Sequence, residues 1–278
     1  MDHCLPANVS SSRPVRESIL EIDDHSWIVG DRLIISLQPA VPSGPFWSDG
    51  ADAFYTISEL ASQQPQPQTR SLSPTSRIKL VHDAGDANAA WRIGEAFLKV
   101  QKQSHQQRTR EHTTLDFLHD PANGIELTSS IPRVLYHNEF NERYYLMTTR
   151  VAGETLEKAW PAMGEAAKQA CVTQVVDTCK ALARKENDKI CGIDGDLSNE
   201  CKVGIIDWEM TGFVPKAWIR TKFCVCGAMD FDFTAIDVKR SKEWRQRVQL
   251  QLAQEGFSEV AEAWERLFWE NYQAIYTK

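Results

Sequence analysis

The stretch RIKLVHDAGDANAAWRIGEAFLKV, residues 77–100, decides the fold of this chain. Apolar and polar residues alternate in three short runs, residues 77–82, 89–93 and 96–100, with turn-forming residues between them. Alternation with a period of two is typical of strands, and turns this short join antiparallel neighbours. The stretch therefore predicts an antiparallel meander of three strands.

The chain that follows changes from strands to helices. A helix is predicted over residues 110–119, where Pro121 ends it, and two more strands over residues 133–138 and 144–149. After Gly153 the apolar residues recur at helical spacing. A sheet lobe followed by a helical lobe is an α+β fold. The predicted helices of the second lobe span residues 155–160, 164–186, 242–254 and 257–276.

The chain before the meander carries weaker signals. Residues 26–37, SWIVGDRLIISL, predict a short β-hairpin around Gly30 and Asp31, and the proline-rich residues 63–75 predict a linker or surface arm. We therefore expect three regions. They are an N-terminal extension (1–75), a sheet lobe (76–152) and a helical lobe (153–278).

The charge and hydrophobicity of the chain argue against some classes of binding partner. The 278 residues carry a formal net charge of -7 without any Lys- or Arg-rich block, which argues against nucleic-acid binding. No run of 18 apolar residues and no signal peptide is found, so no membrane partner is expected. The seven cysteines are odd in number and predict buried free thiols in a cytoplasmic protein.

Lys99 and Glu111 are the first candidates for chemistry. Lys99 is the one charge in the apolar run AFLKV, and a lysine that points from a strand into a cleft can grip phosphate. Glu111 begins the next predicted helix, where it could pair with Lys99. The alternatives are a solvent-facing lysine on an edge strand and an acid favoured by the helix dipole.

Asp207 and the segment after residue 149 are the next candidates. Asp207 ends the apolar run VGIID, so its carboxylate would stand at a strand tip and could bind Mg²⁺. A turn-initiating aspartate is the alternative. The segment Gly153-Glu154-Thr155-Leu156 leads from a strand into a helix and predicts a hinge, although Thr155 is also an ordinary helix N-cap.

The order of these features resembles the aminoglycoside phosphotransferase-like family, specifically its fungal kinase-like branch. The resemblance covers roughly residues 76–275, with a weaker match in residues 26–37. It rests on the stretches VHDAGDANAAWRIGEAFLKV, TREHTTLDFLH, IPRVLYHNEFNERYYLMTTRVAGETLEKAWPAM and GIIDWEMTGFVPKAWIRTKF.

This resemblance implies a two-lobed, protein-kinase-like fold that binds ATP and Mg²⁺ and transfers the γ-phosphate to a hydroxyl of a small molecule. Lys99 would contact the α- and β-phosphates, Glu111 would pair with Lys99, and Asp207 would hold Mg²⁺. The hinge of residues 147–151 would contact adenine through Met147, Thr149 and Val151.

The family's catalytic loop, H-x-D-x-x-x-x-N, is incomplete in this chain. Asp194 and Asn199 satisfy the D-x-x-x-x-N spacing, Asp196-Leu197 is similar to the family's GDL, and the last histidine is His137. Asp194 or Asp196 would serve as the base and Asn199 as a second Mg²⁺ ligand. Asn199 and Asp207 are eight positions apart, whereas two strands and a turn need roughly ten residues.

The resemblance thus implies a truncated helical lobe. In the family, ICGIDG begins a long insert before the catalytic loop, whereas here it runs almost directly into residues 202–206, the predicted post-loop strand. Either the gene has lost these residues or the coding sequence skips an exon. Two functions follow: an ATP-dependent small-molecule phosphotransferase, or a catalytically dead kinase-like protein that binds a nucleotide or a partner.

Overall fold

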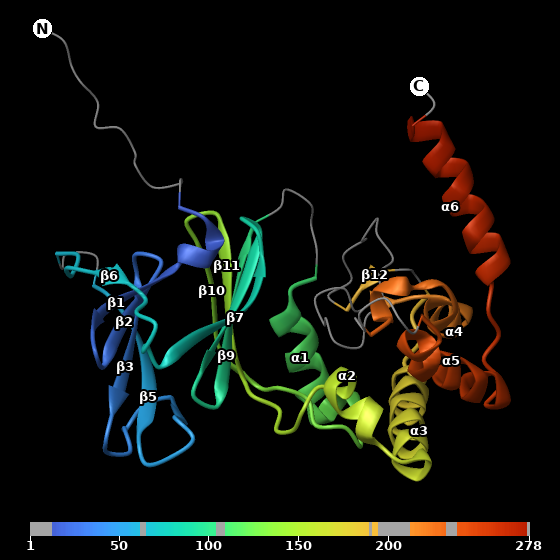
Figure 1. The fold of residues 1–278 in the computed structure, drawn as a ribbon, viewed down its shortest axis with the longest axis horizontal. Helices are drawn as coiled ribbons and strands as arrows, with labels where there is room; N and C mark the ends of the chain where they lie inside the picture. Colours follow the sequence, from blue (N-terminus) through green and yellow to red (C-terminus); the bar gives the residue numbers. More distant parts are fainter. Residues whose placement is uncertain are drawn as a thin grey trace, which may run out of the picture. The chain divides into compact units, whose positions relative to one another are not determined.

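The computed structural model divides the chain into two compact units. Unit 1 is Met1–Gln106 with Pro132–Val151, and unit 2 is Gln107–Ile131 with Ala152–Lys278. Figure 1 shows the strands of unit 1 in blue to yellow-green and the helices of unit 2 in green to red. The structure describes residues 13–61, 65–103, 109–188, 191–193, 212–231 and 238–276.

The first sheet of unit 1 contains six strands in the order β4-β5-β3-β2-β1-β6. The predicted hairpin of residues 26–37 is confirmed as the antiparallel pair β2–β3, and the other strands extend it on both sides. A short 3₁₀ helix, Val15–Glu17, precedes the sheet. The strands are β1 (Ile19–Asp23), β2 (Ser26–Val29), β3 (Leu33–Gln38), β4 (Phe46–Ser48), β5 (Phe54–Glu59) and β6 (Arg70–Ser71).

The second sheet of unit 1 contains five antiparallel strands in the order β10-β11-β9-β8-β7. Sequential strands β7, β8 and β9 are neighbours, so the predicted three-strand meander is confirmed. The later pair β10–β11 adds to the β9 edge of the meander, which makes β9 an interior strand. The strands are β7 (Ile78–Ala84), β8 (Asn88–Ile93), β9 (Ala96–Lys102), β10 (Val134–Phe140) and β11 (Arg143–Thr149).

Both sheets of unit 1 contribute to one hydrophobic core. Trp27 and Tyr55 of the first sheet share this core with Trp91 and Leu98 of the second, and all four are almost fully buried. The indole of Trp47 donates a hydrogen bond to the backbone oxygen of Ile93 at 2.7 Å, which ties β4 to the end of β8. Residues 19–71 are therefore part of the same packed unit as the meander.

Glu21 carries a buried charge at the edge of this core. Its carboxylate accepts hydrogen bonds from Arg70 Nε at 3.0 Å and Ser73 Oγ at 3.2 Å, and only 3% of the residue is exposed. Burial raises the pKa of Glu21, but hydrogen bonds from Ser76, Arg70 and Ser73 outweigh burial and hold the pKa below its ordinary value.

We expect Glu21→Gln to lower the free energy of unfolding by about 1–3 kcal/mol at neutral pH, because buried partners lose a charged acceptor. Because the pKa of Glu21 is lowered in the folded state, its ionised carboxylate stabilises the fold at pH values above the ordinary pKa of 4.5. This stabilisation is lost as the pH falls through the pKa of the folded state. Denaturant unfolding of both proteins should therefore differ at pH 7 and converge in acid. Asp52→Asn, at an exposed position, is the control, and a difference independent of pH would contradict this account.

Unit 2 is built mainly from helices around a second core. Helices α3, α4 and α5 pack together through Val176, Phe223, Trp244 and Val248, among others. Within the described residues no helix is long and apolar enough to cross a membrane. The helices are α1 (Glu111–His119), α2 (Leu156–Ala159), α3 (Glu165–Leu182), α4 (Lys216–Val225), α5 (Val238–Gln254) and α6 (Ala261–Tyr276).

The α+β class predicted from the sequence is confirmed, and the helix ends differ from the predicted ones. The last helix begins at Ala261 instead of residue 257, because Gly256 (φ +81°) closes α5 in a Schellman motif. Phe257 N–H bonds to the oxygen of Leu252 and Gly256 N–H to that of Ala253, each at 3.0 Å. Phe257 then turns into the core, where it is 4% exposed.

Candidate functional site

Lys99 lies near the middle of β9, in the interior of the second sheet. Leu98 and Val100 on either side are fully buried in the core, so strand alternation places Lys99 on the opposite face. Its cross-strand neighbours are Ala90 on β8 and Leu146 on β11. Lys99 is half-buried, and β9 is an interior strand, which corrects the edge-strand part of the alternative.

The predicted hinge residues divide between the core and the surface. Met147 is fully buried in the core on the face away from Lys99. Thr149 exchanges hydrogen bonds with Arg133: its N–H donates to the Arg133 oxygen, and its Oγ1 accepts from the Arg133 N–H, each at 2.8 Å. Val151 is 41% exposed, and within the described residues it makes no hydrogen bond. Of the three predicted hinge residues, Val151 alone is exposed and makes no hydrogen bond to the described residues.

Two residues of β11 share a face with Lys99, and sequence reasoning did not single them out. Leu146 is in register with Lys99, and Thr148 lies two residues further along the same face, opposite Phe97. Because alternate residues of a strand point to the same face, Thr148 shares the face of Leu146 and Lys99, whereas Met147 and Thr149 point to the opposite face. The register of β9 against β11 was the missing signal, because the sequence alone does not fix it.

The chain is firmly positioned up to the residue before Val151. Arg150 donates its backbone N–H to the oxygen of Glu95 at 2.8 Å, and its guanidinium contacts the Glu95 carboxylate at 2.8 and 3.1 Å. Glu95 stands in the tight turn between β8 and β9. The exposed residue Val151 therefore leaves unit 1 from a fixed point at the end of the sheet that carries Lys99.

Glu111 is the first residue of α1 and is 2% exposed. A buried carboxylate at a helix N-terminus is favoured by the helix dipole. Glu111 belongs to unit 2 and Lys99 to unit 1, and the ion pair expected between them stays a prediction.

The predicted catalytic and metal-binding residues fall in one stretch of unit 2. Strands β12 (Cys191–Gly192) and β13 (Gly212–Phe213) pair antiparallel and bring the two ends of this stretch together. Asp194, Asp196, Asn199 and Asp207 lie between these strands and outside the described residues, as does the predicted strand of residues 202–206. Among the residues that the structure does describe, no group of three His, Cys, Asp or Glu could hold a metal ion.

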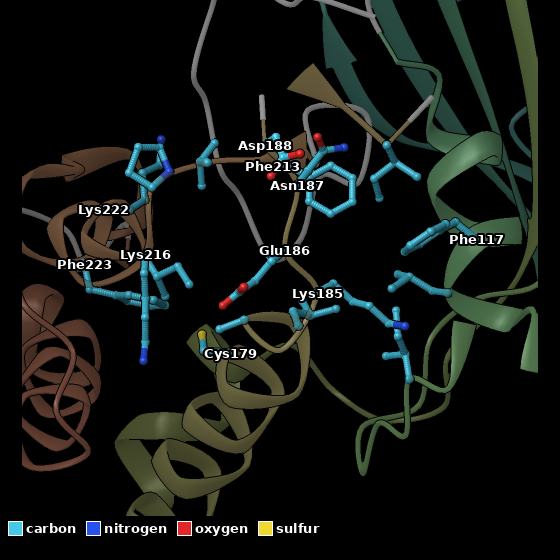
Figure 2. A pocket seen from close by; sticks show the side chains of 18 of the residues that line it. Phe117, Cys179, Lys185, Glu186, Asn187, Asp188, Phe213, Lys216, Lys222 and Phe223 are labelled. Atoms are coloured by element: carbon cyan, nitrogen blue, oxygen red, sulfur yellow. The ribbon is translucent and has the colours of Figure 1, made fainter. Parts of the chain in front are cut away.

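A pocket of about 440 Å³ lies in unit 2 beside the β12–β13 pair. This volume is in the range of small-molecule sites. Figure 2 shows Phe117, Phe213 and Phe223 around the space, with Glu186 projecting between them. The walls come from α1, the C-terminal end of α3, the segment after α3, β13 and α4. Ile193 and Phe213 line it at the two ends of the stretch that carries the predicted catalytic residues.

A scan against models of protein families finds no match, and neither does a search of curated proteins. The described residues offer a half-buried lysine on an interior strand, the exposed Val151 after the end of the neighbouring strand and a pocket in the helical unit.

Proposed function

We propose that the protein binds ATP in the manner of a kinase and is an ATP-dependent phosphotransferase that acts on a hydroxyl of a small molecule. One observation carries the proposal: Lys99 is on the third strand of an antiparallel meander, and the neighbouring strand β11 runs into the exposed Val151. Protein kinases likewise have their phosphate-binding lysine on the third strand and its glutamate on the next helix. In this chain the next helix begins with Glu111.

Two features of the described residues support this proposal. The ammonium of Lys99 is a compact positive charge suited to phosphate oxygens, and the Val151 backbone offers a donor and an acceptor to adenine. The amides before it are held by Arg133 and Glu95. In this proposal Asp207 and Asn199 would hold Mg²⁺, which would neutralise charge on the phosphates.

The proposed transfer moves the γ-phosphoryl group of ATP to the acceptor hydroxyl. The acceptor oxygen forms a bond to the γ-phosphorus, the bond from that phosphorus to the β,γ-bridging oxygen breaks, and ADP leaves. The acceptor's proton passes to the carboxylate of Asp194 or Asp196. Positioning and electrostatic stabilisation supply most of the rate in phosphoryl transfer.

A specific observation favours a second function, nucleotide binding without transfer. The stretch between β12 and β13 contains no histidine, and Asn199 and Asp207 are only eight positions apart. Both functions share the nucleotide site, so ADP release distinguishes them. Release above the uncatalysed rate in the presence of a small alcohol supports transfer, and a bound but unhydrolysed nucleotide supports the second function.

We expect Mg-ATP to stabilise the protein and Lys99→Ala to remove most of this effect. A ligand at one hundred times its dissociation constant stabilises by about 2.7 kcal/mol. Losing a charge-assisted contact should weaken binding by about ten- to a hundredfold. Thermal unfolding followed during a titration with Mg-ATP measures both effects.

Lys102→Ala is the matched control, because Lys102 is on the same strand but is exposed at its end. Its titration should follow the wild type. The nucleotide proposal is wrong if millimolar Mg-ATP leaves the wild-type melting temperature unchanged, or if Lys99→Ala is stabilised as much as the wild type.

A further inference from the structure

The pocket of unit 2 has walls that are mainly apolar. Side chains from separate elements converge on it, so the space of about 440 Å³ is formed by the tertiary fold and not by one helix. Apolar ligands bind such sites because burial removes hydrocarbon surface from water. The apolar wall includes Phe117, Leu182, Phe213, Ile219 and Phe223.

Cys179 adds to the apolar character of the wall. It is 5% exposed, and burial raises the pKa of its thiol to about 12. The thiol is therefore protonated at neutral pH and behaves as a small apolar group. Cys179 therefore contributes no negative charge to the wall of the pocket.

Glu186 is a polar residue whose side chain projects into the space. Figure 2 shows its side chain between the walls, with the carboxylate on the side of Cys179. Glu186 is exposed and, within the described part of the chain, has neither a hydrogen-bond nor an ion-pair partner. An ionised carboxylate only accepts hydrogen bonds, so a ligand in the pocket is expected to present a donor to it.

The other charges around the pocket are mixed in sign. Lys185, Lys216 and Lys222 line it together with Glu186 and Asp188. The ammonium of Lys216 is also occupied elsewhere, because it lies 4.8 Å from the ring centroid of Phe257. A wall with both signs produces no strong single-sign field, which disfavours a polycation or a polyanion. The three lysines and two acids leave a net charge of +1 around the pocket, which disfavours a cation, and the projecting Glu186 carboxylate disfavours an anion. An uncharged ligand therefore fits best.

We propose that this pocket binds a small, uncharged, mainly apolar alcohol, whose hydroxyl donates a hydrogen bond to Glu186. The proposal names the substrate class of the phosphotransferase. For the role of the alcohol as acceptor it rests on that proposed function, in which the hydroxyl proton leaves Glu186 for Asp194 or Asp196 during the transfer. The binding itself depends only on the described walls and on Glu186.

The test is calorimetric titration with cinnamyl alcohol and, as its matched partner, cinnamyl methyl ether. The two probes share their apolar body, and only the alcohol can donate to Glu186. We expect saturable binding of the alcohol and about tenfold weaker binding of the ether, the size of one charge-assisted hydrogen bond. Spermine, a polycation without an apolar ring, should not bind.

Two substitutions locate the site. Glu186→Ala should reduce alcohol binding to the level of the ether and leave ether binding unchanged, with Glu262→Ala on exposed α6 as the control. Ile219→Trp should abolish binding of both probes by filling the space. Because Glu186 is exposed, its loss leaves folding intact, and circular dichroism checks this for each variant.

Four results would overturn the inference. They are equal affinity for alcohol and ether, absence of saturable binding, tighter binding of spermine, and full binding by Ile219→Trp. The proposed function is tested separately, because the titrations use no nucleotide and Lys99→Ala should bind the alcohol normally. If the alcohol binds but Mg-ATP does not raise the melting temperature, the phosphotransferase proposal alone is wrong. If Mg-ATP raises the melting temperature but the alcohol does not bind, this inference alone is wrong.

Discussion

Replacing Arg245 with alanine should destabilise unit 2 by about 3–5 kcal/mol, the cost of leaving one partner of a buried ion pair uncompensated. Arg245, on α5, is 7% exposed, and its guanidinium makes a two-point contact with the Asp230 carboxylate. It also donates to the backbone oxygens of Phe223 at 2.9 Å and Cys224 at 2.7 Å. These oxygens belong to the last turn of α4, where carbonyls lack partners within their own helix.

Denaturant unfolding of Arg245→Ala, followed by circular dichroism, measures this loss. Arg266→Ala, at an exposed position on α6, should change stability by less than about 0.5 kcal/mol. The double variant Arg245→Ala/Asp230→Ala should lose less than the sum of its single variants, because the second change removes the unpaired charge. Additive losses would show that the pair is not coupled and would contradict this explanation.

Gly94→Ala should destabilise unit 1 by about 2–5 kcal/mol, from a left-handed backbone cost of about 1–2 and a packing cost of about 1–3. Gly94 has φ +58° in the turn between β8 and β9. A Cβ atom there would lie 2.5 Å from the oxygen of Ser48 and 2.8 Å from Cα of Asp49. Both are backbone atoms and cannot rotate away. The backbone of Ser48 and Asp49 would therefore have to move away from the turn that contains Gly94.

Gly85→Ala is a closely matched control for this change. Gly85 has φ +69° in the turn between β7 and β8, and a Cβ atom there would meet nothing within 4 Å. It should cost only the backbone term of about 1–2 kcal/mol. Thermal or denaturant unfolding of both variants isolates the packing term, and equal losses would show that the contact with Ser48 relaxes without penalty.

The meander could be predicted because its residues carry a local signal. Alternation along Ala96–Lys102 and the turns at Gly85 and Gly94 are visible in consecutive residues. Strands β1, β4, β5 and β6 were not predicted. β4 and β6 have three and two residues, too few for alternation to show, and they are strands only through pairing with distant segments. Tertiary pairing created them.

Helix α4 was missed although it carries a usable signal. Ile219 and Phe223 are four residues apart and both face the interior side of the helix, and Pro215 stands at the N-cap. The candidate site shows a similar division. Lys99 could be found from its lone charge. The position of Thr148 on the face of Lys99 depends on the register of β11, and the walls of the pocket come from distant segments.

The pairing of Cys191–Gly192 with Gly212–Phe213 has a consequence for how this protein can change through evolution. Because the two strands clamp the ends of the intervening chain, its length can vary without displacing α3 or α4. Doubling the length of such a connection costs only about 0.6 kcal/mol of closure entropy. Gain or loss of residues at this junction therefore costs little free energy, and descendants of one scaffold can differ in this segment while sharing their helical framework.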